Sequence, residues 1–305
     1  TKNIVFKMLN KSKKKFNLCY CPERTQEGKA LEEIKKLPQI ISGYNKNSIL
    51  RAKNIFKKIT RNYIVLKNLE TAEMLKLVDN TYRDVNFAFS NEIARLCSKI
   101  NIDAIEVIEA GKFKYPRTNL ALPGPVGGPC LTKDTYILNE SFKNQNFHPK
   151  ISLTARHENE TVPNFIIKFL KKKIDYKKIN KIVLLGLAFK GNPPTSDLRG
   201  SVAIDFIKEL KKNFRNSKIF GYDNFLSNKD FSNLKLSRLN NLNECFKNTN
   251  ILLILNNNVK FAKLNLIKKS KHMAQEKIIY DCWNLHSKKI FDKKKLAYNT
   301  LGNHN

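Results

Sequence analysis

The sequence predicts an α/β protein in which a long helix connects two sheets. Short apolar runs alternate with longer stretches that repeat apolar side chains every three or four residues. One of these stretches, residues 71–99, is much longer than the others and contains neither Pro nor Gly. From residue 181 onward, strand-like and helix-like segments alternate, and this alternation favours a second, mostly parallel sheet.

The first sheet is predicted from three short β-type runs. These are 17–21 (NLCYC), 39–42 (QIIS) and 63–66 (YIVL), and a lysine-rich helical stretch at about 48–59 lies between the last two. The long helix at 71–99 follows. Its apolar positions recur at helical spacing, which predicts a buried helix, at Ala72, Leu75, Val78, Tyr82, Val85, Ala88, Phe89, Ile93 and Leu96.

A loop rich in Pro and Gly follows the long helix. We expect a second helix from Asp103 to Ala110, ended by Gly111, and then the loop 115–129, which leads into Cys130. Loops of this kind often carry function. Beyond it, the predicted elements are a helical region around 152–173, a strand in 181–189, a helix at 201–212 and strands in KIFGYD (218–223), NILLILNN (250–257) and KIIYDCWN (277–284).

Composition narrows the possible classes of protein. The 57 basic and 26 acidic residues give a formal charge of +31, which raises nucleic-acid binding as one alternative. However, the lysines are scattered, so compositional bias of the source explains the charge better. Six irregularly spaced cysteines indicate reduced thiols and no zinc site. We expect no membrane span and a cytoplasmic location.

The segment PGPVGGPCLTKD (123–134) is the strongest candidate for chemistry. Gly127 and Gly128 allow the backbone to approach a ligand closely, and Cys130 stands four residues before Asp134. If a helix begins near Cys130, the two side chains share a face, and the helix N-terminus favours the nucleophilic thiolate. Taken alone, a structural cysteine beside a solvated carboxylate is the more common explanation.

Two other segments pair polar residues four positions apart. Lys76 and Asn80 lie on the long helix among apolar positions, where a lysine needs a partner. A solvated lysine at the edge of a core is the usual alternative. Glu23 and Glu27, in CPERTQEGKAL, are more often simple partners of a helix dipole.

Taken together and in this order, these segments resemble the UDP-glucose/GDP-mannose dehydrogenase family. The resemblance runs from CPERTQEGKALEEIKKLPQIISG through ETAEMLKLVDNTYRDVNFAFSNEIA and PGPVGGPCLTKD to LLGLAFKGNPPTSDLRGS, nearly the whole chain. It is closest to the branch of UDP-N-acetylglucosamine and UDP-N-acetylmannosamine 6-dehydrogenases. It implies a remnant of an N-terminal Rossmann-like domain (1–68), a central dimerisation and catalytic region (69–150) and a C-terminal Rossmann-like UDP-binding domain (151–305).

The resemblance also implies a reaction and roles for the catalytic residues. The family oxidises the sugar C6 alcohol to a carboxylate in two hydride transfers to NAD. Cys130 matches the nucleophile that forms a thiohemiacetal and then a thioester. Lys76 and Asn80 match groups that stabilise charge on the C6 oxygen. Asp134 matches the partner of the catalytic water and lysine, and Glu23 the residue that assists thioester hydrolysis.

Further positions match binding residues of the family. Arg199 matches an arginine that reaches the cofactor, and its planar fork suits a pyrophosphate; Glu27 and Lys133 are placed on the cofactor side as well. The residues matched to the UDP-sugar substrate are Lys190, Gly127, Gly128 and Arg117, of which Arg117 is expected to cross a dimer interface. The implied assembly is a homodimer formed through the 71–99 helix, and no metal is expected.

The sequence departs from the family at its start. Family members begin with a βαβ unit containing GxGxxG, and LLGLAFKG does not match that motif. Roughly 100 residues, the size of a small domain, are therefore expected to be lost or encoded as a separate N-terminal polypeptide. We expect this chain alone to bind UDP-sugar weakly and not to turn over NAD. The alternatives are a noncatalytic dimerisation module of the family and a basic nucleic-acid-binding protein.

Overall fold

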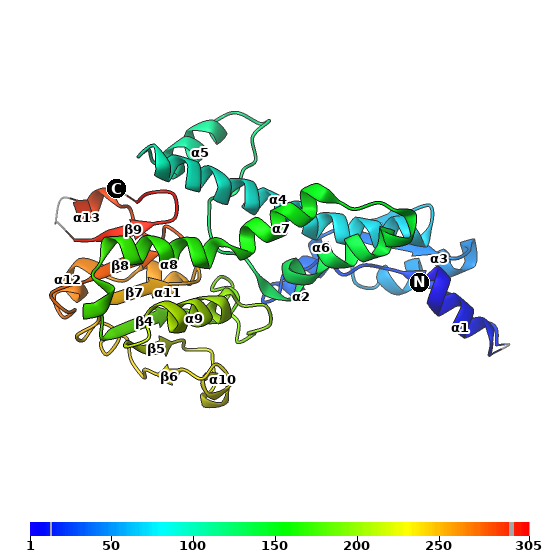
Figure 1. Ribbon diagram of the computed structural model, residues 1–305. Coiled ribbons are helices and arrows are strands. Elements are labelled where there is room, and N and C mark those ends of the chain that lie inside the picture. The colour runs from blue at the N-terminus through cyan, green and yellow to red at the C-terminus, as the bar shows by residue number, and fades with distance from the viewer. Residues whose placement is uncertain (13, 293–295, 305) are drawn as a thin grey trace. The chain divides into compact units, whose positions relative to one another are not determined.

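The chain folds into two compact units, residues 1–81 (unit 1) and 82–305 (unit 2) (Figure 1). The computed structural model describes all residues except 13, 293–295 and 305. The long helix α4 (Leu69–Lys99) begins in unit 1 and ends in unit 2. The predicted α/β class is confirmed, whereas the division into three functional domains stays a prediction.

Unit 1 contains a small three-stranded sheet in the order β1–β2–β3. The middle strand pairs antiparallel with β1 and parallel with β3. The predicted helix at 48–59 begins earlier, because the Asn45 side chain accepts the N–H of Ser48 and caps it. After a π-helical turn (Lys2–Phe6), the elements are α1 (Lys7–Asn10), β1 (Cys19–Tyr20), α2 (Ala30–Lys36), β2 (Gln39–Gly43), α3 (Lys46–Phe56) and β3 (Tyr63–Val65).

Unit 2 combines helices with a six-stranded sheet. Its helices before the sheet are α5 (Ala104–Lys112), α6 (Gly128–Phe142), α7 (Lys150–Glu160) and α8 (Val162–Lys173), with short 3₁₀ turns at Lys143–Gln145 and Tyr176–Lys178. The remaining elements are β4 (Lys181–Leu185), α9 (Val202–Asn213), β5 (Lys218–Tyr222), α10 (Asn228–Asn233), β6 (Ser237–Arg238), β7 (Ile251–Ile254), α11 (Val259–Ala262), α12 (Leu266–Ser270), β8 (Ile278–Asp281), α13 (Lys289–Asp292) and β9 (Tyr298–Thr300).

The six strands of unit 2 are all parallel, in the order β6–β5–β4–β7–β8–β9. Counted from β4, this is 3-2-1-4-5-6, the order of a doubly wound dinucleotide-binding sheet. From β4 the chain adds strands first on one side, β5 and β6, and then on the other side, β7 to β9, so the strand order reverses between β4 and β7. In such sheets, ligands bind beyond the carboxyl ends of the two strands at this switch point.

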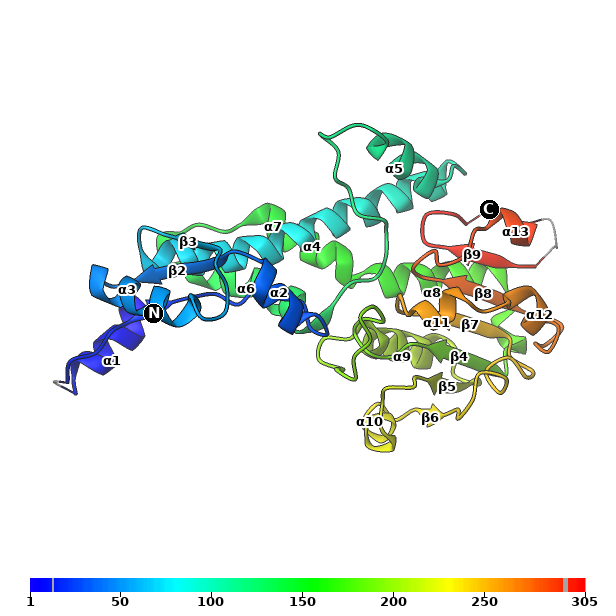
Figure 2. The same ribbon diagram turned by 180° about the vertical axis from the view of Figure 1, so that it is seen from behind.

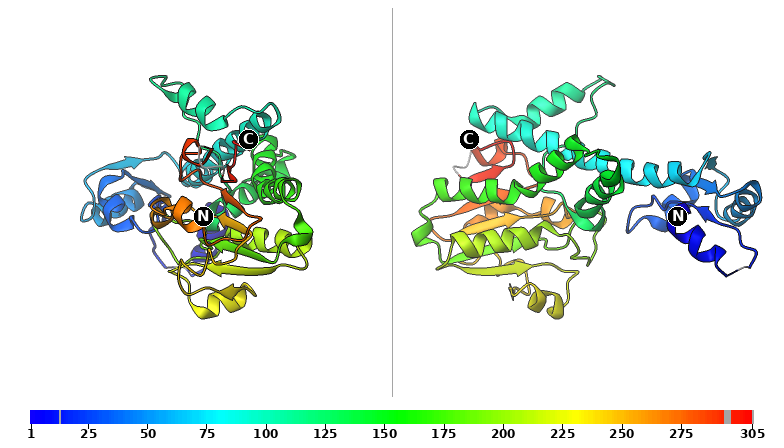
Figure 3. Two further views of the ribbon diagram at one scale, coloured as in Figure 1. Left: turned by 90° about the vertical axis from the view of Figure 1, so that its left-hand side faces the viewer. Right: turned by 45° about the vertical axis from the view of Figure 1, so that its right-hand side comes forward.

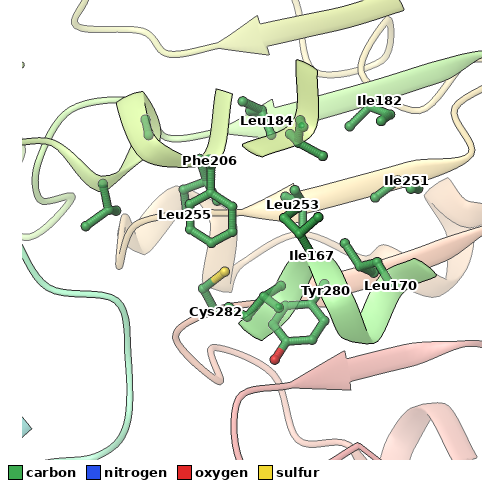
Figure 4. Packing of buried hydrophobic residues seen from close by; sticks show 14 of the residues in the cluster. Ile167, Leu170, Ile182, Leu184, Phe206, Ile251, Leu253, Leu255, Tyr280 and Cys282 are labelled. Atoms are coloured by element: carbon green, nitrogen blue, oxygen red, sulfur yellow. The ribbon is translucent and has the colours of Figure 1, made fainter. Parts of the chain in front are cut away.

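Both faces of this sheet are covered by helices. Alternate residues of β4 point to opposite faces, so Ile182 and Leu184 pack under α8 and α9, while Val183 and Leu185 pack with residues of α11 and α12. Figure 4 shows the first of these layers, and Figure 3 (right) shows α8 and α9 in front of the strands. Figure 2 shows the sheet from behind. The near-continuous apolar strands follow from burial on both faces.

Several predicted helix ends were wrong. Gly111 does not end the second helix, because α5 continues to Lys112. The region 152–173 is two helices, since Pro163 lies in the first turn of α8, the position where its missing N–H costs least. Pro129 likewise belongs to α6, so the preceding loop ends at Gly127. The strands β6 and β9 were not predicted, because two or three residues are too few to show a recognisable strand pattern.

The described residues lack two features that would indicate a membrane or a metal partner. In that part of the chain, no helix combines the length and apolar character needed to cross a bilayer. Within the same residues, no group of three or more His, Cys, Asp or Glu side chains could hold a metal ion. All six cysteines are free thiols.

His304 is packed into the core of unit 2 as an aromatic ring. Its ring stacks on Phe169, with 3.9 Å between centroids, and its two nitrogens lie 2.9 Å from Ser98 Oγ and 2.7 Å from Tyr280 Oη. Burial, followed by the charges of Lys288 and Lys173, lowers the pKa of His304 to about 4. The folded state therefore holds this histidine in its neutral form.

The stability of the protein should depend on pH through His304. An unfolded histidine titrates near pH 6.5, so between about pH 6.5 and pH 4 the unfolded chain binds a proton that the folded chain does not. The free energy of unfolding should therefore fall as pH falls, by up to about 1.4 kcal/mol per pH unit. Urea unfolding at pH 7, 5.5 and 4.5 should show that the free energy of unfolding depends less steeply on pH in His304→Gln than in the wild-type chain. Replacing the exposed His148 by Gln should leave the slope unchanged; equal slopes for all three proteins would contradict the assignment.

Candidate functional site

Cys130 lies in the first turn of α6. The helix begins at Gly128 with Pro129 in its first turn, so the predicted helix start near the cysteine is confirmed. The Cys130 thiol is partly exposed, whereas Asp134, one turn further along, is 3% exposed. Asp134 forms an ion pair with Lys133, its neighbour in sequence. The start of α6 therefore places the Cys130 thiol at the positive end of a helix dipole.

Close backbone contacts hold the start of α6 against a second loop. The Gly128 N–H donates to the Gly200 carbonyl over 2.7 Å, and a Cβ on Gly127 would lie 2.2 Å from the same oxygen. Gly200 itself has a φ of +62°. Close approach within the protein therefore requires glycine at these positions, whereas the predicted approach of Gly127 and Gly128 to a ligand stays a prediction. They bring the segment that carries Arg199 next to the segment that carries Cys130.

The loop after β4 joins the same cluster. A Cβ on Gly128 would lie 2.5 Å from the Phe189 ring, and the Phe189 N–H donates to the Asp197 carbonyl over 3.0 Å. Lys190 follows Phe189, and its ammonium lies 5.4 Å from that ring's centroid. Unit 2 thus brings three of the predicted segments together, those of Cys130, Lys190 and Arg199.

Arg199 presents its guanidinium toward solvent beside Asp197. The side chain is 76% exposed, and its Nη2 lies 2.6 Å from Asp197 Oδ2. The hydrogen bonds from Arg199 hold the pKa of the Asp197 carboxyl below its ordinary value. An exposed planar guanidinium is suited to an incoming phosphate.

A buried polar network, which sequence reasoning missed, fixes the loop before Cys130. Arg156 and Asp84 are 1% and 0% exposed, and Arg156 Nη1 donates to Asp84 Oδ1 over 3.0 Å. Arg156 Nη2 donates to the Val126 carbonyl, and Asn159 donates to Asp84. Burial raises the pKa of Asp84, against the opposing effect of Arg156. The sequence signal that could have revealed this network is the presence of Arg156 and Asp84 among apolar positions of predicted helices.

Asn91 extends this network to Gly124. Its Nδ2 donates to Asn159 Oδ1 over 2.8 Å and to the Gly124 carbonyl over 3.1 Å. Its Oδ1 accepts the Gly124 N–H over 2.9 Å. Both backbone polar groups of Gly124 are therefore satisfied by one buried amide, which fixes the loop six residues before the thiol.

The carboxyl ends of β4 and β7 form a second feature that motif matching missed. Asn257 Oδ1 accepts the N–H groups of Gly191 and Asn192 over 2.9 and 3.0 Å. A Cβ on Gly186, whose φ is +80°, would lie 2.3 Å from Asn256 Oδ1. These side chains lie at the switch point, the expected place for a nucleotide. Lys190 belongs to the same loop.

The predicted residues of unit 1 form their own contacts. Lys76 Nζ donates to the backbone carbonyl of Glu23, which supplies the partner that a half-buried lysine needs. Asn80, one turn further along α4, is 8% exposed, whereas Glu23 and Glu27 are exposed. These four residues belong to unit 1 and Cys130 to unit 2. A cavity shared by Lys76, Asn80 and Cys130 stays a prediction.

Arg117 makes a local contact within its loop. Its Nε donates to the Tyr115 hydroxyl over 2.9 Å, and its guanidinium lies 4.5 Å from that ring's centroid. The side chain is exposed. Its predicted role across a subunit interface stays a prediction.

Comparisons with known proteins agree on one family. Residues 70–161 match the central domain of the UDP-glucose/GDP-mannose dehydrogenase family, and residues 183–288 match its UDP binding domain. A UDP-N-acetyl-D-mannosamine dehydrogenase of Methanocaldococcus jannaschii is 33% identical over 99% of this chain and 67% of its own length. One of Campylobacter jejuni is 38% identical over 63% of this chain and 46% of its own. The solved UDP-D-ManNAc dehydrogenase of Pyrococcus horikoshii superposes with a TM-score of 0.86 at 26% identity, covering 100% of this chain and 70% of that one.

Adding a methyl group at Gly127 should disturb the site. The new Cβ in Gly127→Ala would meet the Gly200 carbonyl at 2.2 Å, so one of the two loops must move. We expect a loss of about 1–3 kcal/mol of stability and a change in the alkylation rate of Cys130. Urea unfolding and iodoacetamide labelling followed by peptide mass spectrometry measure both.

Gly111 offers the matched control. A Cβ there would meet nothing within 4 Å, and the residue is inside α5. Gly111→Ala should therefore stabilise the protein by about 0.5–1 kcal/mol through helix propensity and leave the labelling of Cys130 unchanged. Similar effects of the two substitutions would show that the contact at Gly127 does not matter.

Proposed function

The chain belongs to the UDP-glucose/GDP-mannose dehydrogenase family, and from this premise we propose that it acts in the NAD-dependent oxidation of a UDP-N-acetylhexosamine at C6. The observation that carries the proposal is the position of Cys130, at a helix start held beside the loops of Lys190 and Arg199. The names of the relatives favour UDP-N-acetylmannosamine as the sugar nucleotide.

In the proposed reaction, Cys130 holds the sugar between two oxidations. Loss of a hydride from C6 and a proton from its hydroxyl gives an aldehyde, to which the thiol adds, forming an S–C6 bond. Loss of a second hydride from C6, together with the proton of the thiohemiacetal hydroxyl, gives a thioester. Water then breaks the S–C6 bond, which yields the carboxylate and restores the thiol. The chemistry that NAD supplies when bound is the acceptance of one hydride in each oxidation.

Arg199 is the residue of unit 2 whose chemistry best fits the NAD pyrophosphate. Its exposed guanidinium can bond two phosphate oxygens, and its loop is pressed against the start of α6. Glu27 and Lys133 are proposed as further contacts on the cofactor side. Because Lys133 pairs with Asp134 and is 57% exposed, a phosphate could compete for it.

The remaining predicted residues are assigned by the chemistry of their side chains. Lys76 and Asn80 would stabilise negative charge on the C6 oxygen, as a cation and an amide donor do in any oxyanion site. Asp134 would orient the attacking water, and Glu23 would take its proton. We further propose that Lys190 contacts the substrate phosphates, with Gly127 and Gly128 close to the sugar and Arg117 reaching it from a second copy.

Protection of the Cys130 thiol tests the proposal without requiring turnover. UDP-N-acetylmannosamine bound with its C6 near the thiol should slow iodoacetamide labelling of Cys130, about tenfold at ten times the Kd. GDP-mannose, which carries a different base, should protect much less. Peptide mass spectrometry follows each thiol, and the buried Cys97, Cys245 and Cys282 should stay unlabelled as controls for folding.

The catalytic role requires a second result. Cys130→Ala should retain UDP-N-acetylmannosamine binding in calorimetry within about threefold, because the lost contact is a single sulfur atom. In any preparation that forms NADH from this substrate, the same substitution should abolish formation of the carboxylate. Unprotected labelling of Cys130 at saturating sugar nucleotide, or carboxylate formation by the variant, would refute the proposal.

We also propose that α4 pairs two copies of the chain. The predicted burial of α4 is wrong at Tyr82, Phe89 and Leu96, which are 56%, 53% and 52% exposed. Their spacing of seven residues places them on one stripe of the helix. Large apolar side chains repeated along one exposed face favour a helix-mediated interface. A two-fold arrangement would bring the same stripe from each copy together.

A charge in the middle of the stripe should disrupt such a dimer. Phe89→Glu would place a carboxylate in the interface twice, once from each copy, at a cost of about 2 kcal/mol or more per copy. Sedimentation velocity should show a shift to monomer. Phe113→Glu changes an even more exposed ring, 74%, outside α4 and should leave the dimer intact. A monomeric wild-type chain, or equal effects of both variants, would contradict the proposal.

A further inference from the structure

Trp283, the one tryptophan of the chain, is tied to two strands of the unit 2 sheet. It follows β8, and its backbone N–H donates to Asp281 Oδ1 over 3.0 Å. Its indole Nε1 donates to the carbonyl of Leu255, the residue directly after β7, over 2.8 Å. The indole is therefore fixed at the carboxyl edge of the sheet.

The face of the same indole covers the loop that leads to Cys130. A Cβ on Gly124 would lie 3.2 to 3.3 Å from Trp283 Cε3, Cζ3 and Cδ2, so the ring rests on the Gly124 backbone. Asn91 holds the opposite, polar side of Gly124 through two hydrogen bonds. Phe87 of α4 meets the indole edge to face, with 6.4 Å between centroids. Gly124 is thus held by hydrogen bonds from a buried amide and by packing against the indole.

We propose that Trp283 is a positioning residue that couples nucleotide binding at the sheet edge to the order of the Cys130 loop. The inference rests on the proposed function and adds that the UDP part of the substrate lies at the switch point between β4 and β7, where sheets of this type bind nucleotides. Asn256 lies there, directly after Leu255, and its Nδ2 donates to the Ala188 carbonyl over 3.2 Å. The contacts run from this residue through the Leu255 carbonyl and the indole to Gly124.

The coupling acts on how often the loop opens. A partly exposed thiol reacts with iodoacetamide fastest when its surroundings open locally. A nucleotide that orders the end of β7 also orders the Leu255 carbonyl, and with it the indole and the loop that the indole covers. Opening then becomes rarer, so the nucleotide slows labelling even when it does not touch the thiol.

UDP without a sugar isolates this effect, because it lacks the hexose that would cover Cys130. In the wild-type chain, saturating UDP should slow labelling of Cys130 by about fivefold or more, the lower range of measured couplings between sites. The emission of Trp283 should change over the same range of UDP concentration, since this residue is the sole source of tryptophan fluorescence.

Trp283→Leu should separate coupling from binding. UDP affinity in calorimetry should stay within about threefold of wild type, while the effect of UDP on Cys130 labelling should fall below about twofold. UDP-N-acetylmannosamine should still protect the variant, because the hexose covers the thiol directly. Trp283→Phe keeps a ring over Gly124 but loses the donor to Leu255, and it should give an intermediate response.

Phe231→Leu is the matched control for a loss of core packing. Phe231 is 3% exposed and packs near Gly221 and Leu236, on the β5 side of the sheet. This variant should keep the full effect of UDP on Cys130. Protection of Cys282, next to the substituted residue, verifies that the fold of Trp283→Leu is intact.

Two results would overturn the inference and leave the proposed function standing. One is a wild-type chain that binds UDP with no change in Cys130 labelling. The other is a Trp283→Leu variant in which UDP slows labelling as strongly as in wild type. A wild-type chain that binds neither UDP nor UDP-N-acetylmannosamine would remove both the inference and the proposed function.

Discussion

The ion pair between Arg156 and Asp84 is the interaction on which the placement of Cys130 depends. Both side chains are buried, and each also serves the loop or the helices around it: Arg156 donates to the Val126 carbonyl, and Asp84 accepts from Asn159. Removing one partner would leave a buried charge without compensation, which costs far more than a surface pair contributes. The network therefore defines one position for the loop.

The composition of the loop explains why side chains must hold it. Pro123 and Pro125 have no backbone N–H, so the segment around Gly124 cannot pair as a strand. Pro123–Val126 are nevertheless buried, and their carbonyls need donors. Asn91 and Arg156, from two helices, supply donors for the carbonyls of Gly124 and Val126. A loop held in this way keeps a fixed shape without secondary structure, and this fixes the point at which α6 and Cys130 begin.

Sequence patterns gave the elements more reliably than the contacts between them. Strands such as β4 and β7 were predictable because burial on both faces makes them continuously apolar. The end of α5 and the first residue of α6 were not, because Gly111 and Pro129 are tolerated inside helices at those positions. The segments that contain Cys130, Lys190 and Arg199 were recognised by their resemblance to a family. Asn91, Arg156 and Trp283 instead act through contacts between segments that are far apart in the sequence, and no local sequence pattern encodes such contacts.

Close packing explains why glycines are concentrated where the start of α6 meets the segments that carry Lys190 and Arg199. Gly127, Gly128 and Gly200 meet backbone to backbone or backbone to ring, at separations that no side chain permits. Because these contacts have no flexible side chains to absorb motion, a shift of one loop must displace its neighbour. The segments that carry Cys130, Lys190 and Arg199 are therefore packed so closely that a displacement of one requires a displacement of the others. Any ligand that shifted either of the two loops after β4 would also have to shift the start of α6.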